Sequence, residues 1–230
     1  PALVERSGLP TDYARMVTLS NPLTENHAAM RTSLVPGLLS IAERNARRGI
    51  TGLAVFELGP VFRVPENGAV TPDFLPDEPP TLGILLGGNT SPHWASPARP
   101  YDLYDLKGVV ETLAGWLGHE PRFRPMETPW PLFTSGQAAE VLLNDQVVGY
   151  LGAVSSRVGK AFDLPFGCYV AEIDLRALFD APSRPAQFRE LPAFPPSPRD
   201  LAVLVDRTTP AGDLLDAVRE KGGALLRDAR

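Results

Sequence analysis

Short apolar stretches, several of which alternate with polar residues, recur along the first three quarters of the chain. A period of two indicates a strand with one buried face, and an unbroken apolar run indicates a strand buried on both faces. Asn144-Asp145-Gln146 separates two such stretches and predicts a hairpin turn. The pattern predicts strands at residues 15–20, 53–58 (continuing into 61–64), 81–87, 139–143, 147–154 and 169–175.

Two other segments follow a helical period. Pro36 suits the first turn of a helix that Gly49 can end. Asp102 is a favourable N-cap for a second helix, which Gly118 can stop. Because strands outnumber helices and do not alternate strictly with them, we expect an α+β fold with a mainly antiparallel sheet flanked by helices.

The periodicity changes near the carboxyl end, where prolines accumulate. We interpret residues 186–198 as an extended proline-rich linker that follows a first domain at residues 1–185. Beyond the linker, residues 199–205 predict a strand, Thr209-Pro210 opens a helix ended by Gly222-Gly223, and residues 224–230 begin a second strand.

One strand, one helix and the beginning of another strand cannot bury a core by themselves. We therefore expect residues 199–230 to be an incomplete second domain and the chain to be a fragment of a longer protein.

Composition narrows the class of protein. With 230 residues and 43% hydrophobic residues, the chain has the content of an ordinary globular protein, which excludes disorder throughout. Its one cysteine excludes an internal disulfide and a multi-thiolate zinc site, and it favours a reducing cytoplasm. The chain contains no apolar run of the roughly 20 residues that a membrane span needs. A net charge of −5 does not indicate a nucleic-acid binder.

Residue chemistry alone indicates no active site and no metal site. The three histidines, His27, His93 and His119, have no partners at metal-ligand spacing. Cys168 has no nearby base and is interpreted as a small core residue. Gly87-Gly88 follows an apolar strand but lacks the Gly-Lys-Ser/Thr of a phosphate loop, so a turn is favoured.

A longer pattern changes this interpretation. Residues 21–39 read NPLTENHAAMRTSLVPGLL, which resembles a signature of the β subunit of bacterial phenylalanyl-tRNA synthetase. Later segments resemble further family motifs in the same order, and together they cover nearly the whole chain. These segments are VFELGPVFR at 55–63, YDLKGVVE at 104–111, LLNDQVVGYLG at 142–152 and FPPSPRDLAV at 194–203.

The resemblance implies both a fold and a set of partners. The first domain is expected to have the antiparallel sheet of class II aminoacyl-tRNA synthetases without catalysing aminoacylation, and residues 199–230 are expected to begin a ferredoxin-like anticodon-binding domain. The implied partners are a catalytic α subunit, in an α2β2 heterotetramer, and tRNA(Phe) through the complete subunit. No cofactor is expected on this fragment, whereas the holoenzyme is implied to use ATP and magnesium to attach phenylalanine to its tRNA.

The arginines support a non-catalytic module. A class II site holds ATP with two arginines, and only Arg63 falls where the first of them would lie. The segment after Gly152 lacks the glycine-rich motif and offers only Arg176, so the triphosphate would lack its charge clamp. We expect no catalytic residue, and a structural or interface role for Arg31 and Arg63. The family-motif or interface positions are Asn21, Pro22, Arg31, Thr32, Ser33, Pro36, Gly37, Phe56, Glu57, Gly59 and Arg63, with Arg199 and Asp200 at the start of the tRNA-binding domain.

Two other functions stay open. The chain would be a stand-alone class II-like ATP-dependent small-molecule ligase if Arg63 bound ATP. It would be a general interaction module if the acidic, proline-rich loop at residues 65–80 docked a partner. From residue 199 onward six basic residues face six acidic ones, so this segment carries no basic stripe for tRNA.

Overall fold

A computed structural model describes residues 2–10, 15–22, 28–64, 75–183, 188 and 194–229. Contacts divide the chain into two units, residues 1–186 and 187–230. His27 and most of the loop at residues 65–80 lie outside the described residues, as does most of the linker predicted at 186–198.

One six-stranded antiparallel sheet organises the first unit, in the order β1-β2-β6-β5-β4-β3. The predicted α+β class is therefore confirmed, as are the strands predicted at 53–58, 81–87, 139–143, 147–154 and 169–175. The strands are β1 (Gly52–Pro60), β2 (Pro80–Gly88), β3 (Arg122–Pro125), β4 (Phe133–Leu143), β5 (Gln146–Val154) and β6 (Cys168–Asp174).

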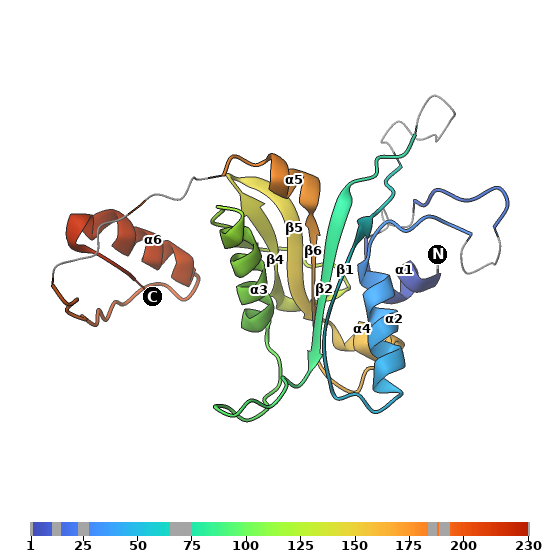
Figure 1. Ribbon diagram of the computed structural model, residues 1–230, viewed down its shortest axis with the longest axis horizontal. Helices are drawn as coiled ribbons and strands as arrows, with labels where there is room; N and C mark the ends of the chain where they lie inside the picture. Colours follow the sequence, from blue (N-terminus) through green and yellow to red (C-terminus); the bar gives the residue numbers. More distant parts are fainter. Residues whose placement is uncertain are drawn as a thin grey trace. The chain divides into compact units, whose positions relative to one another are not determined.

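Helices cover both faces of the sheet, and each layer has its own hydrophobic core (Figure 1). The helices α1 (Ala2–Ser7), α2 (Val35–Ala46) and α4 (Ser156–Ala161) pack on one face. The helices α3 (Leu103–Trp116) and α5 (Leu175–Asp180) pack on the other. Because β2 lies beneath both layers, eight of its nine residues are buried, whereas β1 at the sheet edge alternates between exposed and half-buried positions.

Local signals account for the ends of these elements. Asp102 and Asp105 form a capping box, in which each carboxylate accepts a 2.9 Å hydrogen bond from the other residue's backbone N–H. Gly118, with φ of 79°, follows the end of α3. Asn144 and Asp145 have φ of 49° and 65°, which suits the tight turn between β4 and β5.

Two predicted strands of the first unit are wrong. Residues 15–20 form only an isolated bridge, between Thr18 and Ala29, and residues 61–64 form only a bridge between Arg63 and Asp77. A strand needs a continuous hydrogen-bonded neighbour, and apolar alternation alone does not supply one.

In the second unit the predicted helix is confirmed as α6 (Ala211–Lys221), which ends at Gly222. The strand predicted at residues 199–205 is wrong, because no described segment pairs with it and side chains such as Leu204 are fully exposed. The strand predicted at 224–230 is also wrong: a 3-10 turn, Gly223–Leu225, stands at its start. Apolar residues adopt a strand only where a ladder partner and a covering layer are present.

Candidate functional site

The segment that leads into α2 is bound to the end of β1. The Arg31 guanidinium forms an ion pair with Glu57, and its Nε donates a 2.8 Å hydrogen bond to the carbonyl of Pro60. The carbonyl of Arg31 in turn accepts a 2.8 Å hydrogen bond from the N–H of Phe62. A Cβ at Gly59 would collide with the end of the Arg31 side chain, which would have to shift to make room for it. Arg31, Glu57 and Gly59 therefore form one structural joint between two distant motifs.

The strand register extends this joint into a row of residues across the sheet. Glu57 lies opposite Gly83, Gly83 opposite Glu172, Glu172 opposite Tyr150, and Tyr150 opposite Glu140. Directly paired residues share one face of a sheet. At Gly83, an added Cβ would approach Leu34 and Leu38 to 2.9 Å, so the glycine lets the start of α2 sit close against β2.

Glu172 is a buried polar residue of the site that the sequence did not single out. It is 3% exposed, and its Oε2 accepts hydrogen bonds of 2.7 Å from the Ser33 hydroxyl and from the N–H of Leu34. Its Oε1 accepts a 3.2 Å hydrogen bond from the Tyr150 hydroxyl. A carboxylate on strand β6 thus caps the amino terminus of α2, where the helix dipole favours negative charge.

Burial raises the pKa of Glu172, because a charged carboxylate loses its hydration. This pKa is lowered by the hydrogen bonds from Ser33, Leu34 and Tyr150 and by the positive charge of Arg63. The effect of desolvation is larger, so the pKa of Glu172 is raised overall. Alternation along 169–175 predicted a half-buried strand, in which Glu172 lies on the face opposite the apolar residues Ala171 and Ile173. No local pattern indicated that α2 would cover that position.

Arg63 lies against acidic residues. Its backbone exchanges hydrogen bonds of 2.9 and 3.0 Å with Asp77, and its Nη1 lies 3.7 Å from Oδ2 of Asp174. Asp174 also caps α5, because its Oδ1 accepts hydrogen bonds from the N–H groups of Arg176 and Ala177. Arg176 donates a 2.9 Å hydrogen bond to Asp77. Each of the two arginines considered for ATP is therefore placed beside an aspartate.

A pocket of about 250 Å³ opens where these groups meet, and we call it the sheet pocket. Trp130 and Tyr150 form an aromatic wall with ring centroids 4.6 Å apart in an edge-to-face arrangement. The charged or polar side chains that line the pocket are Arg63, Glu140, Glu172, Asp174 and Thr81. Three carboxylates and one guanidinium do not suit a nucleoside triphosphate, because the net negative charge repels its phosphates.

The other positions carried by family motifs have different surroundings. Thr32 and Pro36 are buried beside the start of α2, and Gly37 in its first turn is exposed. Asn21 and Pro22 are exposed, and Phe56 projects from β1 with 69% of its surface exposed. Arg199 and Asp200 are exposed residues of the second unit.

The remaining chemical candidates lie elsewhere. Burial raises the pKa of the Cys168 thiol to about 12, which fits a core residue and not a nucleophile. Among the described residues, no group of three or more His, Cys, Asp or Glu side chains could hold a metal ion. None of the helices that the structure describes has the length and apolar character to cross a membrane.

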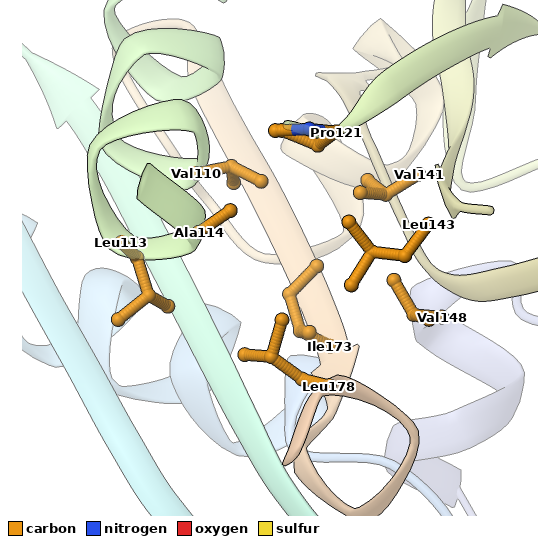
Figure 2. Close-up of a pocket in the computed structure, with 9 residues that line it drawn as sticks. All are labelled: Val110, Leu113, Ala114, Pro121, Val141, Leu143, Val148, Ile173 and Leu178. Atoms are coloured by element: carbon orange, nitrogen blue, oxygen red, sulfur yellow. The ribbon is translucent and has the colours of Figure 1, made fainter. Parts of the chain in front are cut away.

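A second cavity lies beneath α3 (Figure 2) and is lined only by apolar side chains, from α3, β4, β5, β6, α5 and Pro121. Its volume of about 10 Å³ leaves room for one water molecule at most, and the side chains that line it offer no polar group to hold a water. It is a packing gap in the core and offers no ligand site.

The fold and the joint around α2 define an α+β domain in which the buried Glu172 of β6 holds the residues that lead into α2. Comparison with known proteins gives the family: the model described as phenylalanyl tRNA synthetase beta chain CLM domain matches residues 3–175. The chain belongs to this family, and the resemblance drawn from its motifs is confirmed.

Named relatives agree with the family model. The phenylalanine–tRNA ligase beta subunit of Symbiobacterium thermophilum is 38% identical over all of this chain, which spans 25% of the relative's length. That of Moorella thermoacetica is 38% identical over 99% of the chain and 28% of the relative. That of Clostridium tetani is 30% identical over all of the chain and 27% of the relative. The chain therefore spans about a quarter of the ligase subunits it matches.

Proposed function

We propose that this chain is a class II synthetase-like, non-catalytic module that scaffolds the catalytic alpha subunit of a phenylalanine–tRNA ligase. In this proposal the subunits form an α2β2 heterotetramer in the cytoplasm, and the alpha subunit supplies the site for phenylalanine, ATP and magnesium. The chain's family membership supports the proposal, because the relatives are named as beta subunits of this ligase.

The positions of Arg63 and Arg176 carry the non-catalytic part of the proposal. Arg63 borders the sheet pocket together with Asp174, Glu172 and Glu140, and Arg176 pairs with Asp77, so neither guanidinium lies in a site that suits an anion. An ATP molecule would have to displace carboxylates that already neutralise these cations. The stand-alone ligase hypothesis therefore gains no support.

The edge of the sheet offers a surface for the alpha subunit. On the side away from α2, β1 presents Phe56 and Leu58, with 69% and 59% of their surfaces exposed. In the described sheet one edge of β1 has no neighbouring strand. An apolar strip on an open strand edge suits a permanent subunit contact, which buries apolar surface and continues the strand ladder.

Co-expression with the alpha subunit of the same organism tests this surface. The pair is expected to co-purify as one species by light scattering, and the double variant Phe56→Asp/Leu58→Asp is expected to lose association by about tenfold or more. Phe179→Asp, a substitution at an exposed phenylalanine of α5, is the matched control and should leave association unchanged. Equal association of both variants would exclude β1 as the contact.

Catalysis by the chain alone is the second test. We expect no phenylalanine-dependent pyrophosphate exchange from the 230-residue chain, and exchange only after the alpha subunit is added. Turnover without the alpha subunit that disappears in Arg63→Ala would contradict the scaffold role and support a ligase.

For the second unit we propose that residues 199–230 begin a ferredoxin-like tRNA-binding domain. This proposal rests on the family motif at residues 194–203, because the six basic and six acidic residues of this segment provide no basic surface. We expect the isolated chain to bind tRNA(Phe) at least about tenfold more weakly than the complete subunit in a filter-binding assay.

A further inference from the structure

We propose that the sheet pocket is a binding site for a small organic ammonium ion that carries an apolar body. The proposal rests on a cavity of about 250 Å³ in which Glu140, Glu172 and Asp174 meet an aromatic wall, and in which Arg63 is the one cation among the described lining residues. This inference goes beyond the scaffold role and does not depend on it, because every group involved belongs to this chain.

The carboxylates have acceptor capacity directed at the cavity. Glu172 uses Oε2 for Ser33 and Leu34, while its Oε1 accepts only a long hydrogen bond, 3.2 Å, from Tyr150 among the contacts described. Asp174 uses Oδ1 to cap α5, and its Oδ2 lies 3.7 Å from Arg63, which is longer than a hydrogen bond. A carboxylate can accept about four hydrogen bonds, so both oxygens have room for the donors of an ammonium group.

The charges favour a cation over an anion. Glu140 is already neutralised by Arg124, whose Nε and Nη2 lie 2.8 and 2.6 Å from its Oε2. Among the described residues, Arg63 is then the cation near Glu172 and Asp174, and its side chain is 46% exposed. Burial favours the neutral form of Glu172, but an entering ammonium favours the ionised form. With Glu172 ionised, two carboxylates against one half-exposed guanidinium form a negative site that the ammonium completes.

The aromatic wall of the sheet pocket favours a ligand in which the ammonium group is attached to an apolar body. Trp130 and Tyr150 meet edge to face, and Met126 lines the cavity beside them. Aromatic rings hold both hydrocarbon surface and cations, the latter through cation–π attraction. The cavity is smaller than a site for a drug-sized molecule, so the ligand class is a small arylalkyl or alkyl amine.

Three probes with the same phenylethyl body test the charge requirement on the full chain: phenethylamine, 2-phenylethanol and 3-phenylpropanoate. Titration followed by amide chemical shifts is expected to show saturable shifts at Tyr150 and Glu172 with phenethylamine, with about tenfold weaker binding of the alcohol and none of the acid. Equal binding of all three probes, or preference for the acid, would overturn the proposal.

Two variants with opposite expected effects on the affinity for phenethylamine test the roles of Asp174 and Arg63. Asp174→Asn keeps an oxygen for the α5 cap and is expected to weaken phenethylamine binding by about tenfold. Arg63→Gln removes the resident cation and is expected to strengthen binding by about threefold or more. Asp163→Asn is the control, because this exposed aspartate pairs with Arg47 and does not line the pocket. Unchanged affinity in both pocket variants, as in the control, would refute the assignment.

Discussion

The two faces of the sheet use their buried residues differently. The face under α3 and α5 is packed mainly with apolar side chains, which also enclose a small dry gap. The face under α2 combines an apolar core with a polar row in which Glu57, Glu172 and Tyr150 hold the segment before the helix. An apolar layer holds a helix with little directional preference, whereas hydrogen-bonded carboxylates fix its start at one position.

Among the substitutions that test this contrast between the two faces, Glu172→Ala is expected to have the largest effect on stability. It removes the acceptor for Ser33, Leu34 and Tyr150 and leaves buried donors unsatisfied, so we expect a loss of about 3–4 kcal/mol in the free energy of unfolding, measured with urea. The control Glu111→Ala, on the surface of α3 beside Lys107, should cost less than about 1 kcal/mol. Similar losses for the two variants would show that the polar row adds no specific stability.

A smaller effect is expected at the joint between β1 and the segment before α2. Gly59→Ala places a methyl group on the Arg31 guanidinium and should cost about 1 kcal/mol or less, because the flexible end of the Arg31 side chain can shift at the expense of a partly exposed ion pair with Glu57. In an Arg31→Ala background the same substitution should cost less than about 0.5 kcal/mol, since the collision is absent. Additive costs in this double-mutant cycle would contradict the close approach.

The pH dependence of stability should distinguish Glu172 from the apolar face. Its pKa is raised in the folded protein above the ordinary 4.5, so the folded state binds the proton more tightly than the unfolded state. The wild type should therefore lose stability relative to Glu172→Gln as the pH rises through the window that begins near 4.5 and ends at the folded pKa. A stability difference that stays constant from pH 4 to 8 would contradict this.

The smallest effect is expected on the apolar face. Val148→Ile adds one methyl group beside the gap in Figure 2 and should raise the free energy of unfolding by up to about 0.8 kcal/mol. Val147→Ile, at the neighbouring exposed position, should change stability by less than about 0.3 kcal/mol. A loss of stability in Val148→Ile would mean that the face is already fully packed.

Sequence patterns predicted the elements that have strong local signals. The capping residue Asp102, the hairpin turn at Asn144-Asp145 and the buried run of β2 each lie where they were expected. Predictions failed at residues 15–20 and 199–205, which have apolar alternation but no continuous ladder partner among the described residues. A strand depends on a neighbour that its own residues do not specify.

The motif residues show the same difference between what local sequence signals predict and what depends on tertiary contacts. The chain's motifs identified Arg31, Glu57 and Gly59 as important positions, but not that they touch one another. That contact depends on the entry of the chain into α2 beside the end of β1. Glu172 carried no signal at all, because a glutamate on an alternating strand is ordinarily exposed, and here α2 covers it.

For this protein the sequence by itself determined the α+β class, most of the strand positions and the family, because these depend on local periodicity and on motifs that stand in a fixed order. Tertiary structure alone decided that Arg63 would face carboxylates, that Glu172 would cap a helix from a distant strand, and that a pocket would open between them. The reason is physical: charge and burial at these positions are set by strand register and helix placement, which join residues more than a hundred positions apart.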